Sequence, residues 1–233
     1  MPRRLRQPAR RRLRVVDLSY TMLHMNDMVA KSSGGTDHRG LALLAGSQDG
    51  LFTASQAESY GVARRLLSHH AKSGRYERLD RGLYLVPEIP GSPWREVVAA
   101  WLQAGADQAV VSHETALAIH DLSDVISDQI HITVPRARRS LRRPPGAIIH
   151  TRLEPFGDGD VQLRHFVRVT APAVSILDCL EVGTGLEQIE LAIRQAHERG
   201  WISPEDLRGR ARDRGHRVER IVGQLLDAGA ERA

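Results

Sequence analysis

The sequence predicts an α+β protein: an N-terminal winged helix-turn-helix followed by a mixed α/β domain with a helical C-terminal subdomain. Three observations predict it. Residues 51–86 contain two short helical patterns separated by a glycine, then an alternating hairpin pattern. Residues 92–180 alternate between helical and strand patterns, and residues 186–226 have helical periodicity throughout. The 41% hydrophobic content of the 233 residues supports a real core.

The first part of the winged helix has a clear start and a clear turn. Thr53 and Gln56 form a T-x-x-Q capping box, in which the two side chains satisfy backbone N–H groups at a helix start. Gly61 provides the positive φ that a sharp turn requires, and a second helix follows from about Val62. A helix from residues 37–47 completes the three-helix core.

The second helix of this unit has two unlike faces. The residues expected to face the core are Ala63, Leu66, Leu67, His70 and Ala71. The residues expected to face outward are Arg64, Arg65, Ser68, His69 and Lys72. Side chains of these outward types contact the bases and phosphates of DNA.

After Gly74 the hydrophobic period changes from helical to alternating, which predicts a β-hairpin wing with a turn at residues 80–82. Its apolar positions are Tyr76, Leu79, Leu83 and Leu85, and its basic residues are Arg75, Arg78 and Arg81. A helix-turn-helix without basic residues is often a protein-interaction module. Here the helix and the wing are both basic, so we expect the unit to bind double-stranded DNA.

The positive charge of the chain is unevenly distributed. The net charge is +5, of which +7 lies in the first fourteen residues, so the remainder carries −2. Residues 1–36 are expected to be a disordered Arg-rich arm and linker. Two interpretations stay open: the arm grips DNA, or translation starts at Met22, Met25 or Met28. The excess of Arg over Lys suits guanine recognition, but a GC-rich coding sequence would also produce it.

The sequence also indicates the cellular compartment of the protein. No apolar stretch is long enough to cross a bilayer, and no apolar segment of a signal peptide follows the basic start. The single cysteine, Cys179, lies in an apolar run and is expected to be a buried structural thiol. We therefore expect a cytoplasmic protein.

We expect a DNA-binding domain at residues 37–88 and a second domain at residues 92–233, separated by a Pro- and Gly-rich boundary. Ser92 is expected to cap the first helix of the second domain. Strands are expected at residues 109–111, 130–134, 148–152 and 161–169. Helices are expected at residues 112–120, 173–180, 186–199, from 203 onward and 218–226.

A second basic run lies between two of these strands. It consists of Arg136, Arg138, Arg139, Arg142 and Arg143. We expect an exposed loop, with two interpretations open: accessory contacts to the DNA backbone, or a merely solvated loop.

The second domain offers little chemistry for catalysis. Its polar residues cluster as His113, Glu114, His120, Asp121, Asp128 and His131. The H-E-T-A-L stretch lacks the second histidine of a zincin motif. The only lysines are Lys31 and Lys72, so this domain cannot contain the E-x-K triple of a restriction-type nuclease. We predict structural histidines, no catalytic residue, no metal site, no cofactor and no enzyme activity.

Four stretches in order resemble the AbiEi-type antitoxins of type IV toxin–antitoxin and abortive-infection systems. They are R-L-D-R-G-L-Y-L-V-P at residues 78–87, S-H-E-T-A-L-A-I-H-D-L at 112–122, I-H-I-T-V-P at 130–135 and V-T-A-P-A-V-S-I-L-D at 169–178. Where the family often has Arg before Thr, this chain has Val174 and Ser175. For that reason no antitoxic residue is carried over.

The resemblance implies a repressor that binds its own operator through the winged helix, with residues 92–233 needed for antitoxin activity. It implies a nucleotidyltransferase-like toxin as functional partner, without a tight complex. One winged helix covers few base pairs, so two copies are expected on operator repeats about one helical turn apart. The alternatives are a nucleic-acid-processing enzyme and a stand-alone transcription factor, each targeted by the winged helix.

Overall fold

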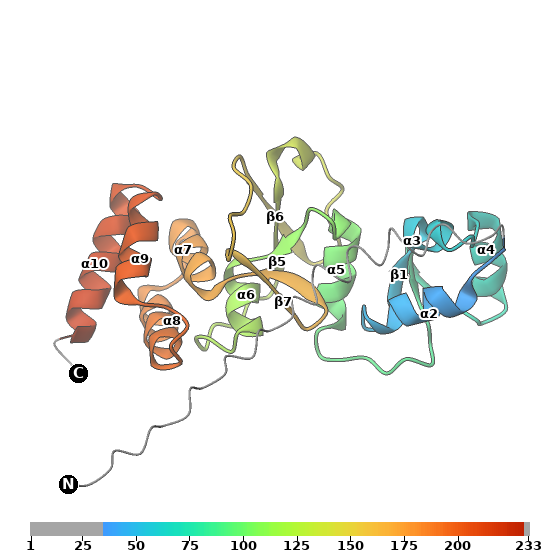
Figure 1. Ribbon diagram of the computed structural model, residues 1–233, viewed down its shortest axis with the longest axis horizontal. Helices are drawn as coiled ribbons and strands as arrows, with labels where there is room; N and C mark the ends of the chain where they lie inside the picture. The colour runs from blue at the N-terminus through green and yellow to red at the C-terminus, as the bar shows by residue number, and fades with distance from the viewer. Residues whose placement is uncertain (1–34, 231–233) are drawn as a thin grey trace, which may run out of the picture. The chain divides into compact units, whose positions relative to one another are not determined.

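The computed structural model describes residues 35–230, which belong to one compact unit (Figure 1). Most of the predicted arm lies outside the described residues. The fold is mixed α+β, as predicted. Its helices are α2 (His38–Gly46), α3 (Ala54–Ser59), α4 (Arg64–Lys72), α5 (Arg95–Gly105), α6 (His113–Ile119), η1 (Arg136–Arg138), α7 (Pro172–Val182), α8 (Leu186–Glu198), α9 (Pro204–Arg212) and α10 (His216–Ala230). Its strands are β1 (Leu51–Thr53), β2 (Glu77–Asp80), β3 (Leu83–Leu85), β4 (Val110–Val111), β5 (Ile130–Pro135), β6 (Ala147–Arg152), β7 (Val161–Arg164) and β8 (Val167–Thr170). No helix among the described residues is long and apolar enough to span a membrane.

The three helices of the predicted helix-turn-helix are α2, α3 and α4. The capping box at the start of α3 is confirmed, because the Thr53 backbone N–H donates to Gln56 Oε1 at 2.8 Å and the Gln56 N–H donates to Thr53 Oγ1 at 3.2 Å. Gly61 has φ +76°, and a Cβ there would lie 2.9 Å from the Gly35 carbonyl oxygen. Both the backbone conformation and the close approach therefore require glycine at the turn.

The wing belongs to a three-stranded antiparallel sheet with strand order β1-β3-β2. The hairpin of β2 and β3 is confirmed, with Asp80 already inside β2 rather than in the turn. Strand β1 has no signal in the sequence, because three residues at a helix cap give too short a pattern. The register of β2 and β3 shifts between Arg78 and Asp80.

Strand β3 is buried on both faces and joins two cores. Tyr84 packs on Phe52 inside the winged helix, with ring centroids 5.6 Å apart. Leu83 and Leu85 pack in a different cluster together with Trp101 of α5. The wing is therefore part of the core that continues into the second half of the chain.

Hydrogen bonds reinforce this joint. The buried Asp49 carboxylate accepts from the Ser92 backbone N–H at 2.9 Å and from its hydroxyl at 2.8 Å, and Arg95 Nε donates to the Asp49 carbonyl at 3.1 Å. The prediction that Ser92 caps α5 is wrong. The helix begins at Arg95 with Trp94 as its N-cap residue, and the Ser92 hydroxyl, which donates to Asp49, accepts from the Trp94 N–H at 3.1 Å just before the helix.

The second half contains a five-stranded sheet with order β6-β5-β4-β8-β7. Helix α5 lies beside this sheet on the side of β1, and α7–α10 lie on the other side (Figure 1). The predicted single strand at residues 161–169 is wrong, since β7 and β8 form an antiparallel hairpin. Its turn consists of His165 and Phe166 at φ +45° and +72°, residue types that give no turn signal in a sequence.

The four predicted C-terminal helices are confirmed, and they pack around one apolar cluster. Helix α7 ends in Gly183 at φ +90°, and Ser203 caps α9 by accepting from the Asp206 N–H. Cys179 is buried in this cluster, and burial raises the pKa of its thiol. It is thus an unreactive core residue.

Candidate nucleic-acid interface

Helix α4 presents its polar residues to solvent. All five residues predicted to face outward are exposed: Arg64, Arg65, Ser68, His69 and Lys72. Leu67 is buried, and Leu66, His70 and Ala71 are half-buried. The prediction that Ala63 faces the core is wrong, because Ala63 is the exposed N-cap residue and Val62 takes the buried place.

One arginine of this face is held by a surface ion pair. Arg64 Nε lies 2.8 Å from Glu58 Oε1 of α3, and the two side chains are 76% and 43% exposed. Exposed pairs of this kind contribute little to stability. The pair positions the Arg64 guanidinium at the start of α4. Because the pair is weak, the guanidinium can leave Glu58 for an anion that attracts it more strongly.

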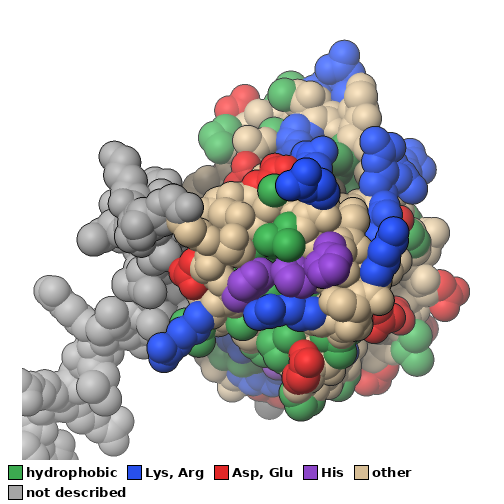
Figure 2. Space-filling view, turned by 90° about the vertical axis from the view of Figure 1, so that its right-hand side faces the viewer, with side chains coloured by type: hydrophobic (Ala, Val, Ile, Leu, Met, Phe, Trp, Pro, Cys, Tyr) green, Lys and Arg blue, Asp and Glu red, His purple; other side chains and the backbone are tan. Residues whose placement is uncertain are grey.

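The wing adds further positive charge. Arg75, Arg78 and Arg81 are all exposed. Arg78 Nε donates to the Asp80 carbonyl oxygen at 3.3 Å, and the Arg75 guanidinium lies 5.9 Å from the Tyr76 ring. Figure 2 shows the end of the molecule that contains α2, α3 and α4. Lys and Arg side chains gather there on both sides of a row of histidines.

A histidine group underlies the end of α4. The His70 ring lies 5.0 Å from the His38 ring and 5.7 Å from the His69 ring. His38 Nδ1 lies 3.1 Å from the Tyr76 hydroxyl. Burial lowers the pKa of His70, helped by the nearby His38 and Arg75. His70 therefore adds no positive charge to α4 at neutral pH.

The wing is attached to α5 by a polar contact. Gln103 Nε2 donates to Asp80 Oδ2 at 2.8 Å, and the Arg81 backbone N–H donates to Asp80 Oδ1 at 2.6 Å. These bonds, the backbone one foremost, lower the pKa of Asp80, and the charge of Arg142 contributes. The β5–β6 connection thus brings a basic side chain near the turn of the wing.

The β5–β6 connection contains the second basic run. Arg136, Arg139, Arg142 and Arg143 are exposed, as expected for a loop. Arg138 differs, because it is half-buried and lies 3.8 Å from Asp107. Residues Arg136–Arg138 form the short 3-10 helix η1.

The structure brings together only part of the polar cluster predicted in the second half. His113 and His131 adjoin each other, and Glu114 Oε2 lies 4.0 Å from His131 Nε2. His120 lies elsewhere and bonds the Thr170 carbonyl through Nε2 at 2.7 Å, while Asp121 pairs with Arg199.

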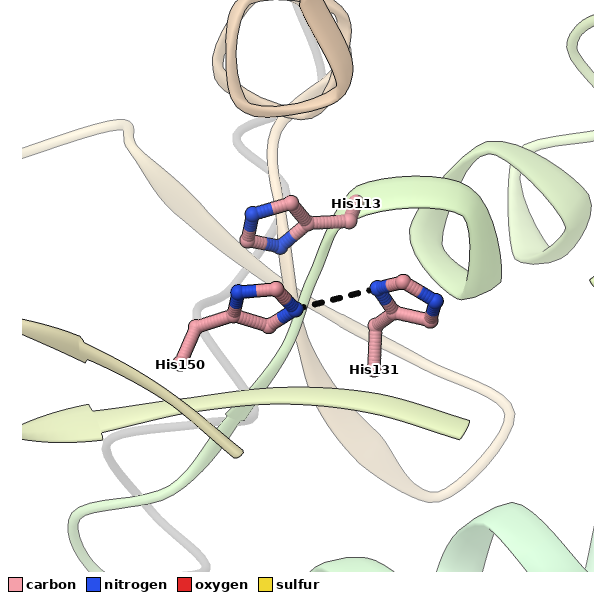
Figure 3. A group of neighbouring side chains, drawn as sticks. All are labelled: His113, His131 and His150. Atoms are coloured by element: carbon pink, nitrogen blue, oxygen red, sulfur yellow. Dashed lines mark hydrogen bonds between the residues drawn. The ribbon is translucent and has the colours of Figure 1, made fainter. Parts of the chain in front are cut away.

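A third ring, His150 of β6, joins His113 and His131 (Figure 3). His131 Nδ1 lies 3.0 Å from His150 Nε2, and the His113 and His150 rings stack with centroids 3.6 Å apart. One nitrogen of each ring lies within 4.8 Å of the others, the spacing of a potential metal site. Burial foremost lowers the pKa of all three, to about 2 for His113 and about 4 for His150.

His150 is not among the predicted cluster residues, because it lies far from His113 along the chain. The available signal was strand alternation: in the β5–β6 register His131 pairs with Ile148 and Thr133 with His150, so both histidines point to one face. Finding that signal requires knowing that these two strands are parallel neighbours.

Residues 41–87 match a family described as transcriptional regulator, AbiEi antitoxin, which confirms the resemblance over the winged helix. Among solved structures, the chain is similar to the RV2827C protein from Mycobacterium tuberculosis, with a TM-score of 0.50 and 14% identity. That alignment covers 86% of this chain and 80% of the other, and supports the fold alone. No curated protein matches the chain.

Proposed function

We propose that this protein is a DNA-binding transcriptional repressor that serves as the antitoxin of a type IV toxin–antitoxin system. The observation that carries the proposal is the exposed basic face of α4 and the wing, within the 41–87 segment that matches a family of regulators. In this proposal residues 37–88 bind DNA and residues 92–233 provide the antitoxin activity. The protein acts in the cytoplasm and is not an enzyme.

In the proposed complex, α4 enters the major groove and the wing lies over the flanking backbone. Arg64 and Arg65, at the start of α4, are the side chains suited to bidentate contacts with guanine. Ser68, His69 and Lys72 follow along the same helix. The wing arginines Arg75, Arg78 and Arg81 then neutralise phosphates.

The joint between the wing and α5 supports this arrangement. Leu83 and Leu85 anchor β3 in the core shared with α5, and Gln103 holds Asp80. A wing anchored in this way keeps a fixed position relative to α4. A preformed surface loses less conformational entropy on binding than a flexible one.

Footprinting on the DNA upstream of the protein's own gene tests the repressor half of the proposal. We expect two protected half-sites about one helical turn, ~10 bp, apart, filled cooperatively by two copies. A promoter–reporter fusion should be repressed by the wild-type chain. Absence of protection at concentrations that saturate non-specific DNA would refute operator binding.

Co-expression tests the antitoxin half separately. The gene beside this one should encode a nucleotidyltransferase-like toxin, and its expression alone should arrest growth. Growth should recover with the full chain, and also with an Arg64→Ala, Arg65→Ala variant that no longer represses. If neither chain restores growth, the antitoxin half of the proposal is refuted and the protein is a repressor without a toxin partner.

A further inference from the structure

The histidine cluster of the second half, His113, His131 and His150, has no part in the proposed DNA contact. Two of the rings are buried and the third is half-buried. The three come from α6, β5 and β6, so only the tertiary fold brings them together. We propose that this cluster is a metal site that binds one Zn²⁺ ion through the three imidazoles.

The donor set determines the class of metal. Three imidazole nitrogens suit borderline-soft ions such as Zn²⁺, whereas Mg²⁺ and Ca²⁺ require oxygen ligands. Three histidines leave the fourth position of a tetrahedral zinc ion for water or another small ligand. His150 is the least buried of the three and thus provides the solvent-facing side of the site.

The positions of the rings are close to what zinc requires. Two nitrogens on one tetrahedral zinc ion, each bonded at about 2.0–2.1 Å, lie about 3.3 Å apart. His131 Nδ1 and His150 Nε2 are already 3.0 Å apart, and the third nitrogen is within 4.8 Å of both. The His113 ring must tilt out of its stack on His150, because a metal ion lies in the plane of each ring that binds it.

Polar groups around the rings resemble the support that metal-binding histidines usually have. Glu114 Oε2 lies 4.0 Å from His131 Nε2, the nitrogen opposite the one that faces His150. Thr184 Oγ1 donates to Glu114 Oε1 at 2.9 Å and so fixes that carboxylate. A carboxylate in this place favours the His131 tautomer whose Nδ1 lone pair is free for the metal.

His113 is held from its own side. Ser112 Oγ lies 2.8 Å from His113 Nδ1 and 2.8 Å from Thr133 Oγ1 of β5. His113 has φ +53°, an uncommon conformation for a non-glycine residue that directs its ring toward the two strands.

The charge around the cluster permits a cation. Arg214 faces His113, but its guanidinium is 2.9 Å from both Asp178 and Glu181, which compensate its charge. The Glu114 carboxylate is therefore the charged group that bears most directly on the site.

Titration of the full chain without an affinity tag, after removal of metals by a chelator, tests the site. Co²⁺ is the spectroscopic probe, and Zn²⁺ should displace it. We expect one Co²⁺ per chain with the intense visible bands of tetrahedral coordination. A protein that binds no Co²⁺ stoichiometrically, or binds it with the weak spectrum of octahedral coordination, would overturn the proposal.

Variants assign the bound ion to the cluster. His131→Ala and His150→Gln should each lower the affinity at least 100-fold, and Glu114→Gln should lower it about 10- to 100-fold. His216→Ala is the matched control, because His216 is an exposed histidine of α10 and its replacement should leave affinity unchanged. Circular dichroism of each metal-free variant checks folding. If His131→Ala does not fold, the affinity of His150→Gln, which replaces a half-buried residue, decides whether the ion binds at the cluster. Unchanged affinity in the folded cluster variants, or loss in His216→Ala, would overturn the assignment.

Discussion

The basic face of α4 and the histidine cluster of the α/β region use polar side chains in opposite ways. On α4 the arginines and lysine are exposed and charged, and the Arg64 ion pair lies at the surface. In the cluster the imidazoles are largely buried, neutral and in contact with one another. The first arrangement suits a polyanion, whose attraction acts over several ångströms in water. The second suits a short-range ligand such as a metal ion, which requires neutral donors at fixed positions.

These two regions are joined through β3, which packs in the cores of both halves, and breaking that joint should have the largest effect. Leu83→Ala should lower the free energy of unfolding by ~2–5 kcal/mol, because Leu83 is 2% exposed and packs in the cluster that includes α5. Leu79→Ala is the matched control on the same hairpin. Leu79 is 42% exposed, so its replacement should change stability by less than ~0.5 kcal/mol.

Urea unfolding followed by circular dichroism and by tryptophan fluorescence measures this difference. Because the joint belongs to one cluster, both probes should report a single transition that shifts as a whole in Leu83→Ala. Two separate transitions, of which only one moves, would show that the halves unfold independently.

Buried histidines should also make the second half sensitive to acid. Burial lowers the pKa of His120 to about 4, so the folded chain resists protonation that the unfolded chain accepts below about 6.5. The unfolded state then binds more protons, and stability decreases as pH falls from about 6.5 to 4. One such group contributes at most about 1.4 kcal/mol per pH unit.

His120→Gln should reduce this loss, measured by urea unfolding at several pH values with a chelator present. The control is His216→Gln, which replaces an exposed histidine on α10. Equal pH dependence in the wild type and in His120→Gln would contradict a neutral buried His120.

The smallest expected effect distinguishes the two interpretations of the β5–β6 loop. Replacing Arg139, Arg142 and Arg143 by Gln should flatten the plot of log affinity against log salt, by about 0.9 for each phosphate that is no longer neutralised. In the control, Gln replaces Arg194, Arg217 and Arg220, which are exposed on α8 and α10. It also removes three positive charges, but far from the loop along the chain, and should leave the slope unchanged. Equal slopes for the two triple variants would mean that the loop is only solvated.

The two regions also differ in how far the sequence predicts them. The outward face of α4, the capping box at Thr53 and the turn at Gly61 depend on neighbouring residues, and local periodicity predicts all three. The misplaced Ala63 is an error at a helix end, where periodicity is weakest.

Errors in the second half have a non-local cause. Ser92 lies three residues before α5 begins, and its N–H and hydroxyl both donate to Asp49, more than forty residues earlier. The turn at His165 and Phe166 has no sequence signal, and it forms because β7 and β8 pair there. His150 joined the cluster through the pairing of β5 with β6, which no local pattern specifies. Predicting these features requires the tertiary fold.

The sharpest test of DNA recognition by α4 is the affinity of an Arg64→Ala, Arg65→Ala variant for the footprinted site and for a scrambled duplex. Each arginine that contacts a base should contribute ~1–3 kcal/mol to site binding, so the preference for the site over the scrambled duplex should collapse. An Arg194→Ala, Arg217→Ala variant of equal charge should bind like the wild type. If the α4 variant keeps the wild-type preference for its site, α4 is not the recognition helix.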